Sequence, residues 1–143
     1  MVGGQSLDFD AVGQELNTQQ LEQMHSLKTG ALIRCAVLLG GLSCESTSDS
    51  QMTALAAYAD NIGLAFQVQD DILDVVGDTS QLGKPQGSDS DKNKPTYVSV
   101  LGLDEAKALA NSLSEKAIAA LQEFPASADP LRELAAFVVS RLH

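Results

Sequence analysis

The chain has 143 residues and a formal net charge of −10, with 44 % hydrophobic residues, 4 % aromatic residues and no tryptophan. This length suits one domain with an aliphatic core of the kind that helical proteins build. The acidic balance argues against a nucleic-acid-binding protein, which needs a basic surface. The two cysteines, Cys35 and Cys44, are nine positions apart, and this spacing favours reduced thiols and a cytoplasmic location over a metal site or a disulfide framework.

Targeting and membrane signals are not apparent. We expect no signal peptide, because Met1 is followed by glycines and polar residues. The apolar run over residues 35–42 is too short to span a bilayer. We therefore expect no stable membrane insertion.

Helix start and stop signals recur along the chain. Capping signals at Asn17, Ser48, Asp104 and Asp129 predict helices over roughly residues 18–42, 48–76, 105–124 and 130–142. Gly3–Gly4 and Gly40–Gly41 indicate helix breaking or close packing rather than a phosphate loop. Residues 77–95 are polar and turn-rich, and a loop of this length in a compact domain is often functional. No strand pattern is convincing, so the prediction is an all-α fold.

The negative charge is concentrated in one segment. Residues 45–91 contain nine acidic residues and one basic residue, whereas residues 92–143 contain six of each. In the helix predicted over 48–76, a sector about 100° wide holds Asp60, Gly63, Gln67, Asp70, Asp71 and Asp74, and continues to Asp78. Apolar residues cover the rest of the helix, and only Gln69 breaks the pattern. Such a helix is expected inside a bundle, with its carboxylates turned toward a cavity.

Three of these carboxylates form a candidate cation site. Asp70 and Asp74 are one helical turn apart and Asp71 lies beside them. Oxygen ligands on a rigid helix suit Mg²⁺, which binds through one or two carboxylates together with substrate phosphates. The alternative is a solvated helix end that holds no ligand.

Lysines accompany the acidic segment. Lys84 and Lys94 lie on the loop that follows it, and Lys28 lies on an earlier helix. Lysines opposite a carboxylate-bound Mg²⁺ form a diphosphate clamp, although each lysine alone could be an ordinary surface charge. His25 lacks a partner histidine, so a surface or packing role is expected for it.

Several motifs follow one another in a fixed order. They are MVGGQ at 1–5 with Asp8, LKTGAL at 27–32, GLAFQVQDDILD at 63–74, and Gly83–Lys84 with GSD at 87–89 and NKPTY at 93–97. With these motifs the chain resembles the C-terminal half of trans-isoprenyl diphosphate synthases, most like the bacterial farnesyl diphosphate synthases (geranyltranstransferases). The resemblance covers essentially the whole chain.

The resemblance implies a fold and a reaction. The family fold is an antiparallel helical bundle around a central cavity, usually in a homodimer. The family reaction condenses an allylic diphosphate, dimethylallyl or geranyl, with isopentenyl diphosphate to give farnesyl diphosphate. In the family, the first Asp-rich motif and the basic residues that bind isopentenyl diphosphate lie upstream of the part that resembles residues 1–143. We therefore expect half of a synthase domain that is inactive alone.

The resemblance also assigns roles to residues. The expected ligands of Mg²⁺, or of Mn²⁺ as its substitute, are Asp70, Asp71 and Asp74. The expected catalytic residues are Lys28, Thr29, Gln67 and Lys84. The expected substrate-binding residues are Gln5, Asp8, Lys28, Phe66, Lys84, Lys94 and Arg141. The lysines would hold the allylic diphosphate, and the oxygens of Thr29 and Gln67 would stabilise positive charge near the reacting carbon.

Two other interpretations remain open. The first is a non-catalytic helical module that oligomerises or docks a partner helix, because a half-bundle would leave apolar faces uncovered. The second is another protein with the isoprenoid synthase fold, such as a synthase of different product length, a terpene cyclase or a regulatory subunit. The loop from Lys84 to Lys94, followed by Thr96 and Tyr97, favours chain elongation over cyclisation.

Overall fold

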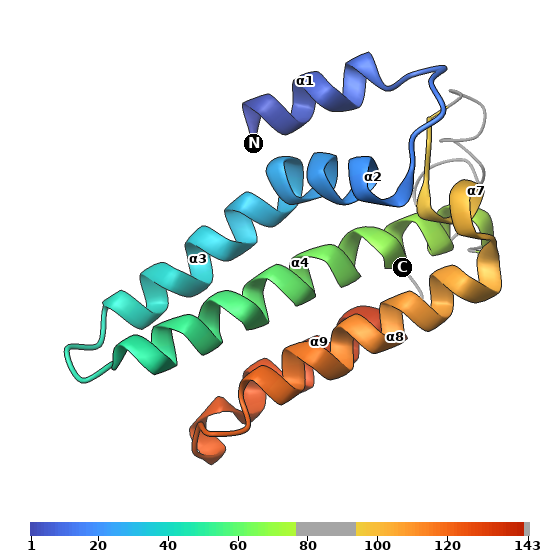
Figure 1. Cartoon of the computed structure of the whole chain (residues 1–143). Coiled ribbons are helices and arrows are strands. Elements are labelled where there is room, and N and C mark those ends of the chain that lie inside the picture. The colour runs from blue at the N-terminus through green and yellow to red at the C-terminus, as the bar shows by residue number, and fades with distance from the viewer. Residues whose placement is uncertain (77–93, 142–143) are drawn as a thin grey trace.

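The computed structural model describes residues 1–76 and 94–141, and the regular elements in these two ranges are helical. They are α1 (Val2–Asp10), α2 (Thr18–His25), the π-helical segment η1 (Ser26–Gly30), α3 (Ala31–Leu42), α4 (Asp49–Val76), α7 (Tyr97–Leu101), α8 (Leu103–Ala120), the 3₁₀ turn η2 (Ala126–Ala128) and α9 (Asp129–Ser140). Figure 1 shows α3, α4, α8 and α9 as neighbouring rods that alternate in direction. The predicted all-α antiparallel bundle is confirmed.

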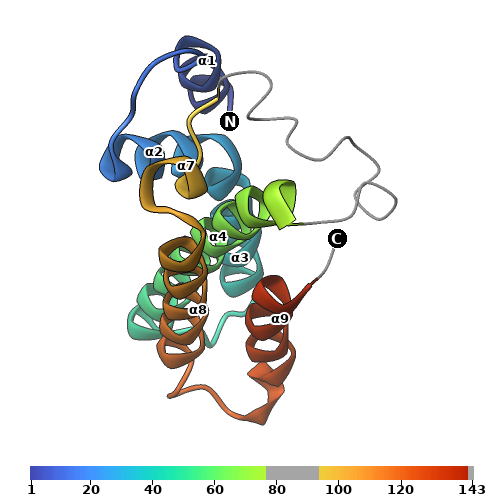
Figure 2. The ribbon, with the colours of Figure 1, turned by 90° about the vertical axis from the view of Figure 1, so that its right-hand side faces the viewer.

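Helix α4 is the centre of this arrangement. It packs against α3 along one side and against α8 and α9 along the other, and it meets α7 and η1 toward its C-terminal end. Figure 2 shows α1, α2 and α7 grouped over one part of the bundle, with α8 and α9 on the other side of α4. The contact between α4 and α8 is lined by small buried residues such as Ala65, Ala106 and Ala110, which allow two helices to approach closely.

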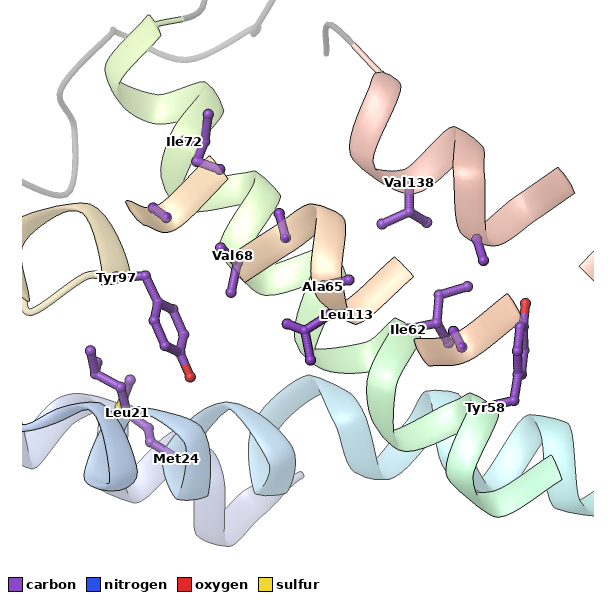
Figure 3. Close-up of a cluster of buried hydrophobic side chains, with 14 of the residues drawn as sticks. Leu21, Met24, Tyr58, Ile62, Ala65, Val68, Ile72, Tyr97, Leu113 and Val138 are labelled. Atoms are coloured by element: carbon purple, nitrogen blue, oxygen red, sulfur yellow. The ribbon is translucent and has the colours of Figure 1, made fainter. Parts of the chain in front are cut away.

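The core is aliphatic, as the composition predicted, but two tyrosines belong to it. Figure 3 shows Tyr97 reaching from α7 toward Leu21 and Met24 on α2, and Tyr58 at the other end of the cluster. The hydroxyl of Tyr58 donates a hydrogen bond to the carbonyl of Leu131 at 2.8 Å. A buried tyrosine usually needs such a partner, so this bond ties α4 to α9.

Two predicted capping boxes are confirmed. The side chain of Asn17 accepts a hydrogen bond from the Gln20 amide at 2.9 Å, and the Gln20 side chain accepts one from the Asn17 amide at 2.9 Å. Ser48 and Gln51 make the same reciprocal pair at the start of α4, at 2.9 and 3.2 Å. These bonds satisfy amide groups that the first helical turn leaves without partners.

Two predicted helix starts were wrong by a residue or more. Asp104 does not cap α8, because Gly102, with φ +88°, ends α7 and turns the chain so that α8 begins at Leu103. Asp104 instead lies in the first turn, where an acidic side chain favours the helix dipole. Asp129 is likewise inside α9 and forms an ion pair with Arg132 at 2.5 Å.

The helix predicted over residues 18–42 is continuous but not uniform. Residues Ser26–Gly30 form a π-helical segment between α2 and α3. Such single-turn π-segments occur frequently at functional sites because they displace side chains from the regular helical spacing. This one contains Lys28 and Thr29.

Gly4 explains how α1 approaches this segment. A Cβ atom at Gly4 would lie 2.2 Å from the backbone nitrogen of Lys28, whereas a Cβ at Gly3 would meet nothing within 4 Å. The close-packing interpretation is confirmed for Gly4, and the helix-breaking interpretation is wrong because both glycines lie inside α1. On the opposite side, Gly63 of α4 brings its Cβ position within 3.2 Å of the Cα of Gly30. Helices α1 and α4 therefore enclose η1 at close range.

None of the helices that the structure describes is long and apolar enough to cross a bilayer.

We predict that Gly4→Ala destabilises the chain while Gly3→Ala does not. Alanine gains about 0.5–1 kcal/mol over glycine in a helix, but at position 4 overpacking against backbone costs about 1–3 kcal/mol. Urea denaturation of the two variants and the parent chain measures the difference. Equal stabilities of the two variants would contradict the close approach of α1 to η1.

Candidate functional site

The polar face of α4 is mostly buried, and it meets polar groups from several other elements. On this face Gln67, Asp71 and Asp74 are buried, with Asp74 only 2 % exposed, and Asp70 is partly exposed, whereas the buried Gln69 lies on another side of α4. A buried polar side chain is costly unless it is hydrogen-bonded. The partners of these side chains therefore tie α2, α7 and the C-terminal end of α9 to α4.

Two of the predicted lysines converge on one carboxylate. Oδ2 of Asp8, on α1, lies 2.7 Å from Nζ of Lys28 and 3.4 Å from Nζ of Lys94. Burial alone would raise the pKa of the Asp8 carboxyl, but the two ammonium groups outweigh burial and hold that pKa below its usual value. Asp8 is therefore ionised near neutral pH.

The Asp8–Lys28–Lys94 cluster carries a net charge of about +1 when all three groups are ionised. The lysine side chains keep 28 % and 29 % of their surface exposed, so each has donor capacity left for an anion. The sequence predicted both lysines and placed Asp8 in the same cavity, but it did not show that Asp8 holds the lysines together. Lys84 lies outside the described residues, and Gln5 is exposed on α1.

A second cluster joins the ends of α4 and α9. The guanidinium of Arg141 forms an ion pair with Oδ1 of Asp70 and lies 4.3 Å from the centroid of the Phe66 ring. Its Nη2 also donates to the carbonyl of Phe66 at 3.4 Å. Arg141 is thus paired with Asp70, which the resemblance assigned to the metal. Its guanidinium also lies over the ring of Phe66, which the resemblance assigned to substrate binding.

The three aspartates have different surroundings. Asp71 accepts a hydrogen bond from the backbone amide of Tyr97 at 2.7 Å. Asp71 and Asp74 line a pocket of about 370 Å³ with Lys94, which agrees with the predicted cavity beside the carboxylates. Asp70 is paired with Arg141 instead and keeps 43 % of its side chain exposed.

The three aspartates therefore do not form a preformed cation-binding site. Within residues 1–76 and 94–141, no three His, Cys, Asp or Glu side chains stand close enough to share a metal ion. The donor set fits Mg²⁺ in another way, because this ion commonly binds one carboxylate, waters and substrate phosphates. Of the three aspartates, Asp70 is the one whose side chain is partly exposed.

Gln67 is held by His25, for which the sequence predicted a surface or packing role. Oε1 of Gln67 lies 3.1 Å from Nδ1 of His25 at the end of α2, while Thr29 lies half-buried in η1. His25 is buried and its ring stacks on Tyr97, which fits the packing alternative of that prediction, whereas the hydrogen bond with Gln67 was not predicted. One signal could have indicated the burial: His25 follows the core residue Leu21 by four positions and so shares its helical face.

Comparison with known proteins places these features in a family. Residues 1–131 match the family model described as polyprenyl synthetase. The chain is 46 % identical to the farnesyl diphosphate synthase of Escherichia coli over 99 % of this chain and 48 % of that enzyme. It is 39 % identical to the geranylgeranyl diphosphate synthase of Cyanophora paradoxa over 99 % of this chain and 47 % of that enzyme. It spans about half the length of these relatives, and the farnesyl diphosphate synthases match it with their C-terminal half.

A solved structure gives the same result in three dimensions. The chain superposes on the structure of a geranyltransferase from Helicobacter pylori, complexed with magnesium and isoprenyl diphosphate, with a TM-score of 0.80 at 30 % identity. The superposition covers 98 % of this chain and 46 % of the Helicobacter pylori chain. The motifs, the helical bundle and the family match agree, and the chain belongs to the polyprenyl synthetase family.

Proposed function

We propose that this chain supplies the diphosphate-binding half-site of a prenyltransferase that makes farnesyl diphosphate. The substrates would be dimethylallyl or geranyl diphosphate and isopentenyl diphosphate. The observation that carries the proposal is the convergence of Lys28 and Lys94, from motifs far apart in the sequence, on Asp8 near the polar face of α4. The similar Helicobacter pylori structure, which is a complex with magnesium and isoprenyl diphosphate, supports it.

The chemistry explains why this half-site needs cations. The C–O bond of the allylic diphosphate breaks, and its electron pair leaves on the diphosphate. The isopentenyl double bond then attacks the allylic carbon, and a proton is lost. Ammonium groups fixed beside the departing diphosphate stabilise the charge that develops there. Lys28 and Lys94 would do this directly, and Asp8 would keep their side chains in place.

Magnesium would complete the charge balance. Bound Mg²⁺ would neutralise charge on the phosphate oxygens, and Asp70 would hold it. For this, the guanidinium of Arg141 must leave Asp70. Arg141 would then be available near isopentenyl diphosphate, as the resemblance implies, and the Phe66 ring would be uncovered for the isoprenoid. Asp71 and Asp74 would support the site through α7 and through the pocket beside Lys94.

The chain exposes apolar surfaces, as expected if it forms only half of a synthase domain. Large apolar side chains are exposed on α1 and α3, including Phe9, Leu32 and Leu39. A groove of about 520 Å³ lies between α3 and α4. In a complete synthase domain, these surfaces would be covered by the half that carries the first Asp-rich motif, and the domain would form a cytoplasmic homodimer. A non-catalytic module would use the same surfaces to oligomerise.

A hybrid enzyme tests the proposal. This chain would replace the matching C-terminal half of the Escherichia coli farnesyl diphosphate synthase. We expect the hybrid to condense geranyl diphosphate with isopentenyl diphosphate to a fifteen-carbon product, and we expect the chain alone to be inactive. A folded but inactive hybrid would overturn the function, and turnover by the chain alone would overturn the half-site.

We predict that Asp70→Ala lowers kcat of the hybrid by about 10²-fold or more, because a group that stabilises developing charge is worth about that much. Asp60→Ala is the matched control on the same helix, since Asp60 is exposed and pairs only with Arg34 among the interactions that the described residues show. It should leave kcat within about twofold of the parent, as expected for a surface pair. Steady-state kinetics at saturating Mg²⁺ measures both. Near-normal turnover of Asp70→Ala would exclude the metal role.

We also predict that Lys28→Ala and Lys94→Ala each raise the KM for geranyl diphosphate by about ten- to a hundredfold, the size of one charge-assisted hydrogen bond. Lys116→Ala, at an exposed position on α8, should not change it. Equal KM values in all three variants would show that the lysine cluster does not bind the allylic diphosphate.

A further inference from the structure

His25 lies where three parts of the bundle meet. It is the last residue of α2, directly before the π-helical segment, and it is 7 % exposed. Nδ1 of its ring lies 3.1 Å from Oε1 of Gln67 on α4. The ring also stacks on Tyr97 of α7, with 5.6 Å between the ring centroids and 27° between the planes.

The stacking partner is itself fixed. The backbone amide of Tyr97 donates to Asp71 at 2.7 Å, and Figure 3 shows the Tyr97 ring directed at α2. The imidazole of His25 is therefore restrained by an aromatic face and by a carboxamide. Because a carbonyl oxygen only accepts hydrogen bonds, the proton of the neutral ring belongs on Nδ1 when Oε1 of Gln67 faces it.

This arrangement has a cost that packing alone would not require. Nε2 of His25 and the hydroxyl of Tyr97 are buried without a hydrogen-bond partner among the described residues. An apolar ring at position 25 could stack on Tyr97 and leave no unpaired nitrogen. The contribution that histidine adds here is the hydrogen bond to Gln67.

We propose that His25 is a positioning residue that orients the Gln67 carboxamide for the transfer reaction through the hydrogen bond from its Nδ1. The inference rests on the proposed function, in which the oxygen of Gln67 stabilises positive charge near the reacting carbon. A carboxamide oxygen has two lone pairs. His25 engages one of them, which leaves the other in a defined direction for the substrate.

The surroundings of His25 keep its ring neutral. Burial lowers the pKa of His25, and the hydrogen bond with Gln67 opposes this only in part. The charged groups that act on the ring are Lys28, Asp8 and Asp70. A neutral donor suits a site where a carbocation forms, because an imidazolium beside it would repel the developing charge.

The hydrogen bond can be measured in this chain without any turnover. Nitrogen-15 NMR of the His25 ring near neutral pH distinguishes the two neutral tautomers. We expect the proton on Nδ1, with a signal that changes in Gln67→Leu. A proton on Nε2, or a signal indifferent to Gln67→Leu, would overturn the proposal whether or not the hybrid enzyme is active.

Kinetics of the hybrid separate positioning from packing. His25→Phe keeps an aromatic ring against Tyr97 but loses the hydrogen bond, whereas His25→Asn loses the ring and keeps an amide donor near the position of Nδ1. We expect His25→Phe to lower kcat by about ten- to a hundredfold, the cost of a misplaced catalytic group, with both KM values within about threefold. His25→Asn should restore most of the lost kcat. In a hybrid that already carries Gln67→Leu, His25→Phe should not lower kcat any further, because the hydrogen bond is already absent.

The control is Tyr58→Phe, which removes a buried hydrogen bond to Leu131 at the opposite end of α4. It should lower stability to urea and leave kcat unchanged. Equal losses in His25→Phe and His25→Asn, or an undiminished effect of His25→Phe without Gln67, would show that His25 only maintains the fold. An inactive hybrid with the native His25 would instead count against the proposed function, and the tautomer measurement would still decide the hydrogen bond.

Discussion

The structure depends on one constraint, which is that α4 carries polar side chains into the interior of a helical bundle. Each of these groups needs a partner, since an unpaired polar group in the core is costly. Gln67 finds His25 at the end of α2, and Asp71 finds the amide of Tyr97 at the start of α7. Gln69 donates to the carbonyl of Arg141 at 3.3 Å. The partners come from three separate elements, so the buried polar side chains of α4 fix their positions.

The positions of the candidate site residues follow from this constraint. Lys28 lies three residues after His25, and Lys94 three residues before Tyr97, so both lysines are attached to elements that α4 holds. Helix α1 then closes against η1 through Gly4 and brings Asp8 between the two ammonium groups. The ion cluster is thus a consequence of backbone packing on one side and of polar pairing on the other.

Much of this could be predicted from the sequence, because the relevant signals are local or periodic. The capping boxes at Asn17 and Ser48 use neighbouring residues, and the narrow polar face of α4 is visible from its helical spacing. The family resemblance correctly placed in one bundle the motifs that lie within residues 1–76 and 94–141. Local signals do not encode which buried groups meet, so the pairing of Gln67 with His25 could not be derived. The same limit applies to the three aspartates, which look alike in sequence although Asp71 is bonded to the Tyr97 amide and Asp70 is paired with Arg141.

The central claim is that this half of the bundle binds diphosphate and magnesium together through the lysine cluster and Asp70. The most direct measurement is a titration of the chain with inorganic diphosphate, with and without Mg²⁺, followed by amide NMR signals. The account predicts that Lys28, Lys94 and Asp70 respond together and that the response strengthens when both ligands are present. It would be contradicted if Mg²⁺ alone shifted all three aspartates while the lysines stayed unchanged, or if neither ligand produced any shift.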